Sequence, residues 1–193
     1  MSTATLSKIT APVAAAVCGQ FELEPQSLPL LNESLGSEQF LRILIEQKHY
    51  VDAVGFLAHA LPKREAVWWA CVCARAALGT APADEELKCL SLAEAWVIEP
   101  SEANRRAAMA AAEASEFKTP ASWAAIAAFW SEGSMAPADL PEVPPAENLT
   151  GKAVTAAVMI AVGLGEPDKM EERYRQLLAR GLDVARGGNG SVA

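Results

Sequence analysis

The chain is 193 residues long, 51% apolar and 6% aromatic, and it carries a formal charge of −8. This length suits one domain with its own core, and the apolar content excludes a disordered chain. An acidic chain without a basic cluster is a poor ligand for nucleic acid, because neutralising phosphates requires clustered Lys and Arg. The charge is also localised, since residues 82–147 hold twelve acidic and four basic residues and the rest of the chain is balanced.

The first 18 residues do not read as a secretion signal. They are weakly apolar and carry Pro12 in their middle, so we expect a first helix that starts at Pro12. The four cysteines lie in apolar helical runs, where a thiol behaves as a small core side chain, and we expect them to be reduced. No apolar run reaches the roughly 18 residues of a membrane span. These features predict a cytoplasmic protein without membrane insertion.

Apolar residues recur at helical spacing along almost the whole chain. Ser37 is a candidate N-cap for the stripe that follows it, Ser101 and Thr119-Pro120 are stronger helix starts, and the acids at 84–86 suit a helix N-terminus. The stripes begin at Phe40, Tyr50, Val67, Leu87, Ala103, Trp123, Val154 and Met170.

No convincing alternating strand interrupts this pattern, so the predicted fold is all-α, with about eight helices in a single domain over residues 1–186. Abundant alanine allows helices to approach closely. The sequence leaves open whether they form an irregular bundle or a short α-solenoid-like array, since no fixed-period repeat is present.

Two segments depart from the helical pattern. Residues 133–148 contain four prolines and three acids, which predicts an extended loop. This Pro-rich loop is either a partner-binding strap, with Pro141, Pro144 and Pro145 as candidate contacts, or a linker whose Leu140 and Val143 pack on the bundle. The Gly-rich residues 187–193 predict a flexible tail.

Catalytic, metal and cofactor motifs are weak or missing from the sequence. His49 and His59 are ten residues apart on one predicted helix, too far to share a metal. Cys71 and Cys73 are two apart and point in different directions on a helix. Residues 151–152 resemble the end of a P-loop but lack its other glycine and its Ser or Thr. We therefore expect no enzyme activity, no metal and no cofactor.

The densest cluster of distinctive residues is the segment 62–75. Trp68 and Trp69 are adjacent and point about 100° apart on a helix, so both are expected mainly in the core, with a groove or partner anchor as the alternative. Arg75 is expected to be buried beside a carboxylate, from Glu65 or Glu94. Trp130, with Trp123, completes the set of aromatic residues that a ligand pocket could use.

Several of these motifs together resemble an uncharacterised bacterial family, a domain of unknown function. The resemblance rests on Val17-Cys18 with residues 21–23, on residues 52–71, on residues 123–131, on the 141–145 loop, on residues 149–154 and on residues 182–187. It covers most of the chain and implies an all-helical unit with no known catalytic residue. It also implies a loose association with type VI secretion gene neighbourhoods.

The sequence therefore predicts a non-enzymatic protein-interaction module, such as an accessory, adaptor or chaperone of a secretion system. Its acidic middle favours a basic protein partner. Two alternatives stay open: a structural homo-oligomer, and a small-ligand binder or enzyme with a pocket among Trp68, Trp69, Arg75, Trp123 and Trp130. The oligomeric state is not determined by these patterns.

Overall fold

The computed structural model describes residues 5–191, and over that range it is built from helices, turns and extended connections. The all-α prediction is confirmed. In chain order the described helices are α1 (Ala14–Cys18), α2 (Ser37–Glu46), α3 (Tyr50–Ala60), α4 (Lys63–Ala77), α5 (Asp84–Ile98), α6 (Glu102–Ala114), α7 (Pro120–Phe129), α8 (Leu149–Gly163) and α9 (Met170–Ala185), with short 3-10 helices η1 (Leu28–Leu30) and η2 (Pro167–Lys169).

Helix starts follow the local chemistry at two of the three predicted caps. The Ser101 hydroxyl accepts a hydrogen bond from the Asn104 amide, and Thr119 forms a reciprocal capping box with Ser122 ahead of α7. Ser37 is not an N-cap, because it is the first residue of α2 and its hydroxyl donates to the Ala11 carbonyl. A tertiary contact with the preceding segment has replaced the local cap there.

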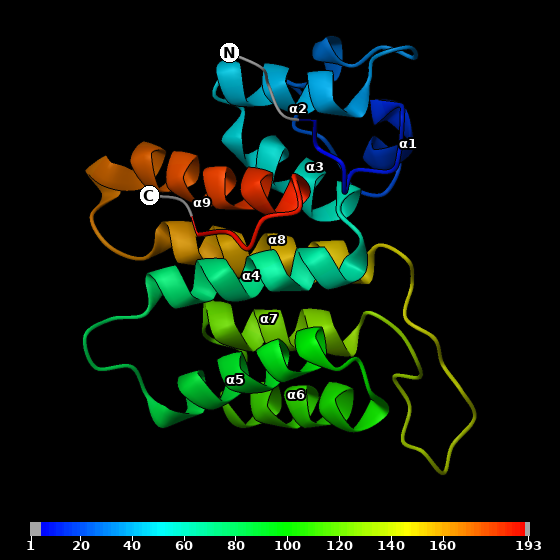
Figure 1. Ribbon diagram of the computed structural model, residues 1–193, viewed down its shortest axis with the longest axis vertical. Coiled ribbons are helices and arrows are strands. Elements are labelled where there is room, and N and C mark those ends of the chain that lie inside the picture. Colours follow the sequence, from blue (N-terminus) through cyan, green and yellow to red (C-terminus); the bar gives the residue numbers. More distant parts are fainter. Residues whose placement is uncertain (1–4, 192–193) are drawn as a thin grey trace.

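The helices stack in layers (Figure 1). At one end α1, α2 and α3 pack on one another, and α3 then rests on α8 and α9. The middle layer contains α4, α8 and α9, and the far end contains α5, α6 and α7. Helix α4 contacts α5, α7, α8 and α9, so it joins the middle layer to the far end.

Helix α7 is the most enclosed element, because it packs against α4, α5, α6 and α8. Every residue of α7 except Trp123 is buried, and five of them are alanines. Such small side chains let four neighbours approach one helix from all sides. The all-round apolar pattern of α4 also corresponds to a central position, with Trp69, Cys71 and Cys73 fully buried.

The four cysteines are free, as expected for core residues. Cys71, Cys73 and Cys89 are buried and Cys18 is half-buried. Within residues 5–191 no helix combines the length and the apolar character that crossing a membrane requires.

Candidate interaction surfaces

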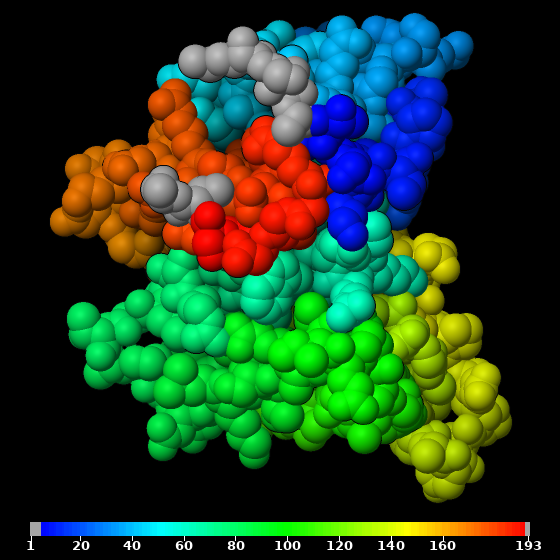
Figure 2. All heavy atoms as spheres, in the orientation of Figure 1, coloured from blue at the N-terminus to red at the C-terminus, as the bar shows by residue number. Residues whose placement is uncertain are grey.

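The Pro-rich loop, residues 133–148, leaves the body of the molecule between α7 and α8 (Figures 1 and 2). Its two ends are tied together by a hydrogen bond from the Met135 amide to the Val143 carbonyl, 2.8 Å long. The Ser134 hydroxyl accepts from the amides of Ala136 and Val143, at 3.1 and 3.0 Å. The base of the loop is therefore closed by its own backbone, although the segment has no regular secondary structure.

Two arginines of α6 bind the backbone at this base. The Arg105 guanidinium donates to the Ser134 carbonyl at 2.7 Å, and the Arg106 guanidinium donates to the Ala136 carbonyl at 2.8 Å. Glu102, one turn earlier, pairs with both arginines and fixes their direction. Hydrogen bonds from Arg105, reinforced by those from Arg106, lower the pKa of the Glu102 carboxyl to about 2.

Arg105 is the fully buried charged residue of this cluster. Besides Glu102 and the loop, it donates to the Phe129 carbonyl at 2.7 Å and lies over the Phe129 ring at 4.5 Å. Gly133 has φ of +67° and lies against the guanidinium, so a side chain there would be strained and close to Arg105. Sequence reasoning missed this role, because the Arg105-Arg106 pair has no pattern that distinguishes a buried guanidinium from a surface one.

The tip of the loop points into solvent. Leu140, in the tip, is 55% exposed and Val143, at the base, is 48% exposed, so the alternative in which they pack on the bundle is wrong. Pro141 and Pro144 are exposed and Pro145 is half-buried. Two apolar side chains and two prolines are thus presented to solvent beside the exposed acids Asp139 and Glu142, which are adjacent to them in the sequence.

Much of the negative charge of residues 82–147 has no counter-charge in the structure. Among the described residues, four of the twelve acids form salt bridges: Glu94, Glu102, Glu116 and Glu147. The other eight form none: Asp84, Glu85, Glu86, Glu99, Glu113, Glu132, Asp139 and Glu142. The acidic surface predicted from the sequence therefore consists of the start of α5, the ends of α5 and α6, and the loop.

The tryptophans do not gather around one pocket. Trp69 is fully buried and donates to the Leu177 carbonyl at 2.9 Å, whereas Trp123 of α7 meets Trp130, the residue that follows α7, edge to face. Trp68 is half-buried and lies between two cavities of about 340 and 350 Å³, one of which it shares with Arg75. The predicted core position is confirmed for Trp69, whereas Trp68 is half-buried against the core and borders two cavities, as the groove alternative predicts.

Arg75 differs from its prediction in burial but not in partner. Its side chain is exposed, and it binds both carboxylate oxygens of Glu94, at 2.6 and 2.7 Å. Glu65, the other expected partner, pairs instead with Lys8. This exposed ion pair raises the pKa of Arg75 and leaves its guanidinium at the edge of the Trp68 cavity.

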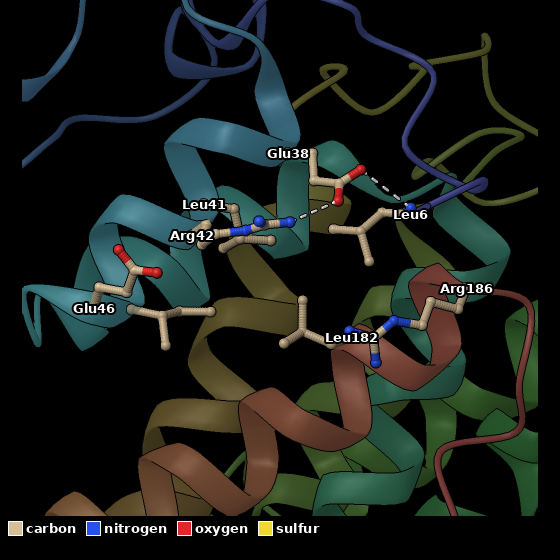
Figure 3. A pocket seen from close by; sticks show the side chains of 8 residues that line it. Leu6, Glu38, Leu41, Arg42, Glu46, Leu182 and Arg186 are labelled. Atoms are coloured by element: carbon tan, nitrogen blue, oxygen red, sulfur yellow. Dashed lines mark hydrogen bonds and ion pairs between the residues drawn. The ribbon is translucent and has the colours of Figure 1, made fainter. Parts of the chain in front are cut away.

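A further cavity of about 380 Å³ lies between α2 and α9 (Figure 3). Its apolar part comes from Leu6, Leu41, Ile45 and Leu182, and its rim carries two acids and two arginines. The Glu38 carboxylate accepts from Arg42 at 3.1 Å and from the Leu6 amide at 3.4 Å, as drawn in Figure 3.

A serine, a histidine and an aspartate meet at the start of α3. The Ser27 hydroxyl contacts His49 Nδ1 at 2.6 Å and donates to the Asp52 carboxylate, which also accepts from the Glu24 amide. In a hydrolytic triad the histidine lies between the other two groups, whereas here the serine does. Ser27 is fully buried, and the cluster anchors the 24–27 turn on the start of α3.

Over residues 5–191 no group of three or more His, Cys, Asp or Glu side chains is arranged to hold a metal ion. His59 stacks on Phe21 and donates its Nδ1 proton to the Gly55 carbonyl, and burial lowers its pKa. Burial raises the pKa of the Cys71 and Cys73 thiols. Neither the pair His49 and His59 nor the pair Cys71 and Cys73 is placed to bind a metal.

Comparisons with known proteins show membership of one family. No curated protein and no solved structure matches the chain. A model described as a family of unknown function (DUF6931) matches residues 40–185, from within α2 to the end of α9. The matched range contains Trp68, the Pro-rich loop, and Arg105 and Arg106, which hold the base of that loop. The chain belongs to this family of unknown function.

Proposed function

We propose that the protein is a non-enzymatic protein-interaction module that binds a basic partner protein through the Pro-rich loop. One observation carries the proposal: the loop is fixed at its base by Arg105 and Arg106, yet it exposes the side chains of Leu140 and Val143 to solvent. A segment that only connected two helices would gain stability by packing these side chains, at about 25 cal/mol per Å² of apolar surface.

The rigid base supports binding because it reduces the entropy that a partner would otherwise have to overcome. Hydrogen bonds through Ser134 and Met135 hold the loop ends, and the prolines restrict the backbone between them. The loop is thus ordered before any partner arrives, which is the usual condition for a specific interface.

The sign of the partner's charge follows from the acids around the loop. Asp139 and Glu142 are adjacent in sequence to the exposed Leu140 and Val143, and Glu132 precedes the loop, with no salt bridge to any of the three acids among the described residues. Complementary charge accelerates association and excludes acidic competitors. A basic surface with a shallow apolar depression is the partner chemistry that fits.

The test uses a photo-crosslinking amino acid in place of Leu140 in the native host, with the same substitution at Leu164 as control. Leu164 is exposed to a similar degree but lies at the end of α8, away from the loop. We expect a basic protein to crosslink at position 140 and not at 164. Equal crosslinking at both positions would contradict a role for the loop.

The recovered partner is then purified and its affinity measured by calorimetry at two salt concentrations. Asp139→Lys with Glu142→Lys should weaken binding at least about tenfold and flatten its salt dependence. Asp168→Lys, an exposed acid in η2, is the matched control and should change little. Unaltered binding by the double variant would reject the loop as the docking site.

The finer form of the proposal places this module in the cytoplasm of a bacterium as an accessory, adaptor or chaperone of a type VI secretion system. Its support is the resemblance to chains associated with such gene neighbourhoods. Deleting the gene and measuring secreted effectors tests it, with the Asp139→Lys and Glu142→Lys variant as the complementing allele. Normal secretion in the deletion strain would remove the secretion role and leave the docking proposal intact.

A further inference from the structure

A second surface surrounds Trp68, and its charge is opposite in sign to that of the Pro-rich loop. We call it the Trp68 groove: the surface of α4 around Trp68 and Val72, bounded by Ile98 of α5 and by Arg180 of α9. It comprises the cavities of about 340 and 350 Å³, which meet at Trp68. Ile98 is 75% exposed on its rim, so the groove offers apolar surface to a ligand.

The groove is covered by the described part of the tail, residues 187–191, which returns from α9 across α4 (Figure 1). Three side chains bind its backbone. The Trp68 indole donates to the Asn189 carbonyl at 3.0 Å, the Asp183 carboxylate accepts from the Gly190 amide at 2.9 Å, and Arg180 donates to the Gly190 carbonyl at 3.1 Å. Every one of these bonds goes to a backbone atom, so they hold the backbone of the tail and leave its side chains unbound by these three residues.

The backbone path of the tail requires glycine at three positions, which composition alone does not show. Gly187 and Gly190 have φ of +92° and +79°, where other residues are strained, and a Cβ on Gly188 would collide with the Asp183 carboxyl. Positions 189 and 191 alone of these five can carry side chains without that conflict, and they hold Asn and Ser. The predicted flexibility of residues 187–193 stays a prediction, and residues 192–193 lie outside the described range.

The tail therefore leaves the groove poorly filled. Hydrogen bonds hold the backbone of the tail, but its small side chains do not occupy the apolar space on either side of Trp68. The charges are also incomplete, because Arg64 in one cavity and Arg180 in the other donate to carbonyls and, among the described residues, neither pairs with a carboxylate. An apolar side chain and an acidic side chain would each find a site that the tail leaves unused.

We propose that the Trp68 groove docks a segment of a partner protein that carries a bulky apolar residue and an acidic residue, and that the tail is a weak cover which this segment displaces. The proposal does not depend on the Pro-rich loop, whose acidic tip would favour a basic surface. A chain with both sites can join two different partners of opposite charge.

The probe is a synthetic peptide with the sequence of residues 187–193 that carries Asn189→Leu and Ser191→Glu. It keeps the glycines that the path requires, places an apolar side chain where Asn189 borders both cavities, and places a carboxylate in the cavity of Arg180. The unsubstituted tail peptide is its control. Binding is followed in the full-length protein by NMR, through the indole N–H signal that Trp68→Phe identifies.

Gly190→Pro releases the tail without altering any side chain of the groove, because proline cannot adopt φ of +79° or donate to Asp183. We expect the probe to bind this variant about tenfold more tightly than the wild type, since the competing cover is removed. The Trp68 indole signal should shift, and the control peptide should bind at least about fivefold more weakly than the probe.

The complementary variant does not require the tail to be released. Placing Asn189→Leu and Ser191→Glu in the full chain should fill the groove from within, raise the midpoint of thermal unfolding and prevent the probe from binding. The proposal is overturned if the probe fails to bind Gly190→Pro, binds it no better than the wild type, or leaves the Trp68 signal unchanged. Self-association of Gly190→Pro that Asp139→Lys abolishes would also overturn it, because a second copy's loop would then be the occupant.

Discussion

Glu102 shows how one carboxylate organises the base of the Pro-rich loop. Its pKa of about 2, against an ordinary value of 4.5, results mainly from the hydrogen bonds of Arg105. A carboxylate with a lowered pKa in the folded state stabilises the protein above the unfolded pKa, and this contribution is lost as pH falls through the folded pKa. Glu102 should therefore favour folding at neutral pH and lose that effect between about pH 4.5 and 2.

The measurement compares urea unfolding of the wild type and of Glu102→Gln at neutral pH and at about pH 3. The variant should be less stable at neutral pH, and the difference should shrink at the lower pH. Because the Glu102 side chain is more than half exposed, solvent screening limits the effect to about 1 kcal/mol. Glu113→Gln, on the same helix without a salt bridge, is the control; an equal pH dependence there would contradict the assignment.

Gly181 is a helical glycine at which alanine should be harmful. In an exposed helix, Gly→Ala stabilises by about 0.5–1 kcal/mol, because glycine is entropically costly there. At Gly181, however, a Cβ would lie 2.6 Å from Cε2 of the buried Trp69 and 2.7 Å from a methyl of Leu57. Overpacking of this kind costs about 1–3 kcal/mol, so we expect Gly181→Ala to destabilise the protein.

Gly163 provides the matched control, because it is an exposed residue in the last turn of α8 with no atom within 4 Å of an added Cβ. Gly163→Ala should stabilise the protein in the same thermal-unfolding assay. If both variants shift the midpoint in the same direction, the close contact between α9 and Trp69 is not rigid.

At the residue scale, sequence patterns identify chemistry better than burial. Trp68 and Trp69 are adjacent on a helix that is apolar nearly all round, so periodicity could not tell which one faces the core. Arg105 was indistinguishable from a surface residue, because its burial depends on carbonyls of Phe129 and Ser134 that the chain brings back 24 and 29 residues later. The ion pair of Arg75 with Glu94 was predictable because it joins consecutive helices.

The order of the Pro-rich loop depends on Ser134. Its hydroxyl accepts two amide hydrogen bonds that close the base, and its carbonyl accepts from both arginines. Ser134→Ala leaves the carbonyl contacts but removes the hydroxyl, so the loop should open locally while the helices stay folded. We expect faster amide hydrogen exchange at Ala136 and Val143, and little change in the unfolding midpoint.

Ser91→Ala is the matched control, since the Ser91 hydroxyl donates to the Leu87 carbonyl on the exposed face of α5. It should leave exchange in the loop unchanged. Exchange at Val143 that is equally slow in wild type and Ser134→Ala would show that the remaining hydrogen bonds, from Met135 and the two arginines, keep the loop closed.

At the element scale, helix starts were predictable where the signal is local. Ser101 and Thr119-Pro120 supply their own caps, and both helices begin there. The loop between α7 and α8 was predictable from its prolines, but its direction was not, because the arginines that hold it lie on α6 and carry no sequence mark of that contact. The order of the layers was equally hidden, since alanine faces pack with almost any neighbour.

The whole molecule places α4 where its cysteines can report global unfolding. Burial raises the pKa of Cys71 and Cys73 above their ordinary 9.0 and raises the pKa of the half-buried Cys18 to about 11. Thiolate is the reactive form, so at mildly alkaline pH a buried thiol reacts only after the structure opens. Because α4 contacts α5, α7, α8 and α9, exposing both of its cysteines requires the middle layer and the far end to separate.

We therefore expect iodoacetamide to modify Cys18 first, and Cys71 and Cys73 later at one common rate, as resolved by mass spectrometry of the digested protein. With rising urea, that common rate should follow the global unfolding transition measured by circular dichroism. Such coincidence would also test the prediction that residues 1–186 fold as one cooperative unit. Modification of Cys71 and Cys73 well before the transition would instead show that the layers separate without unfolding, and that the helices behave as an array of stacked pairs.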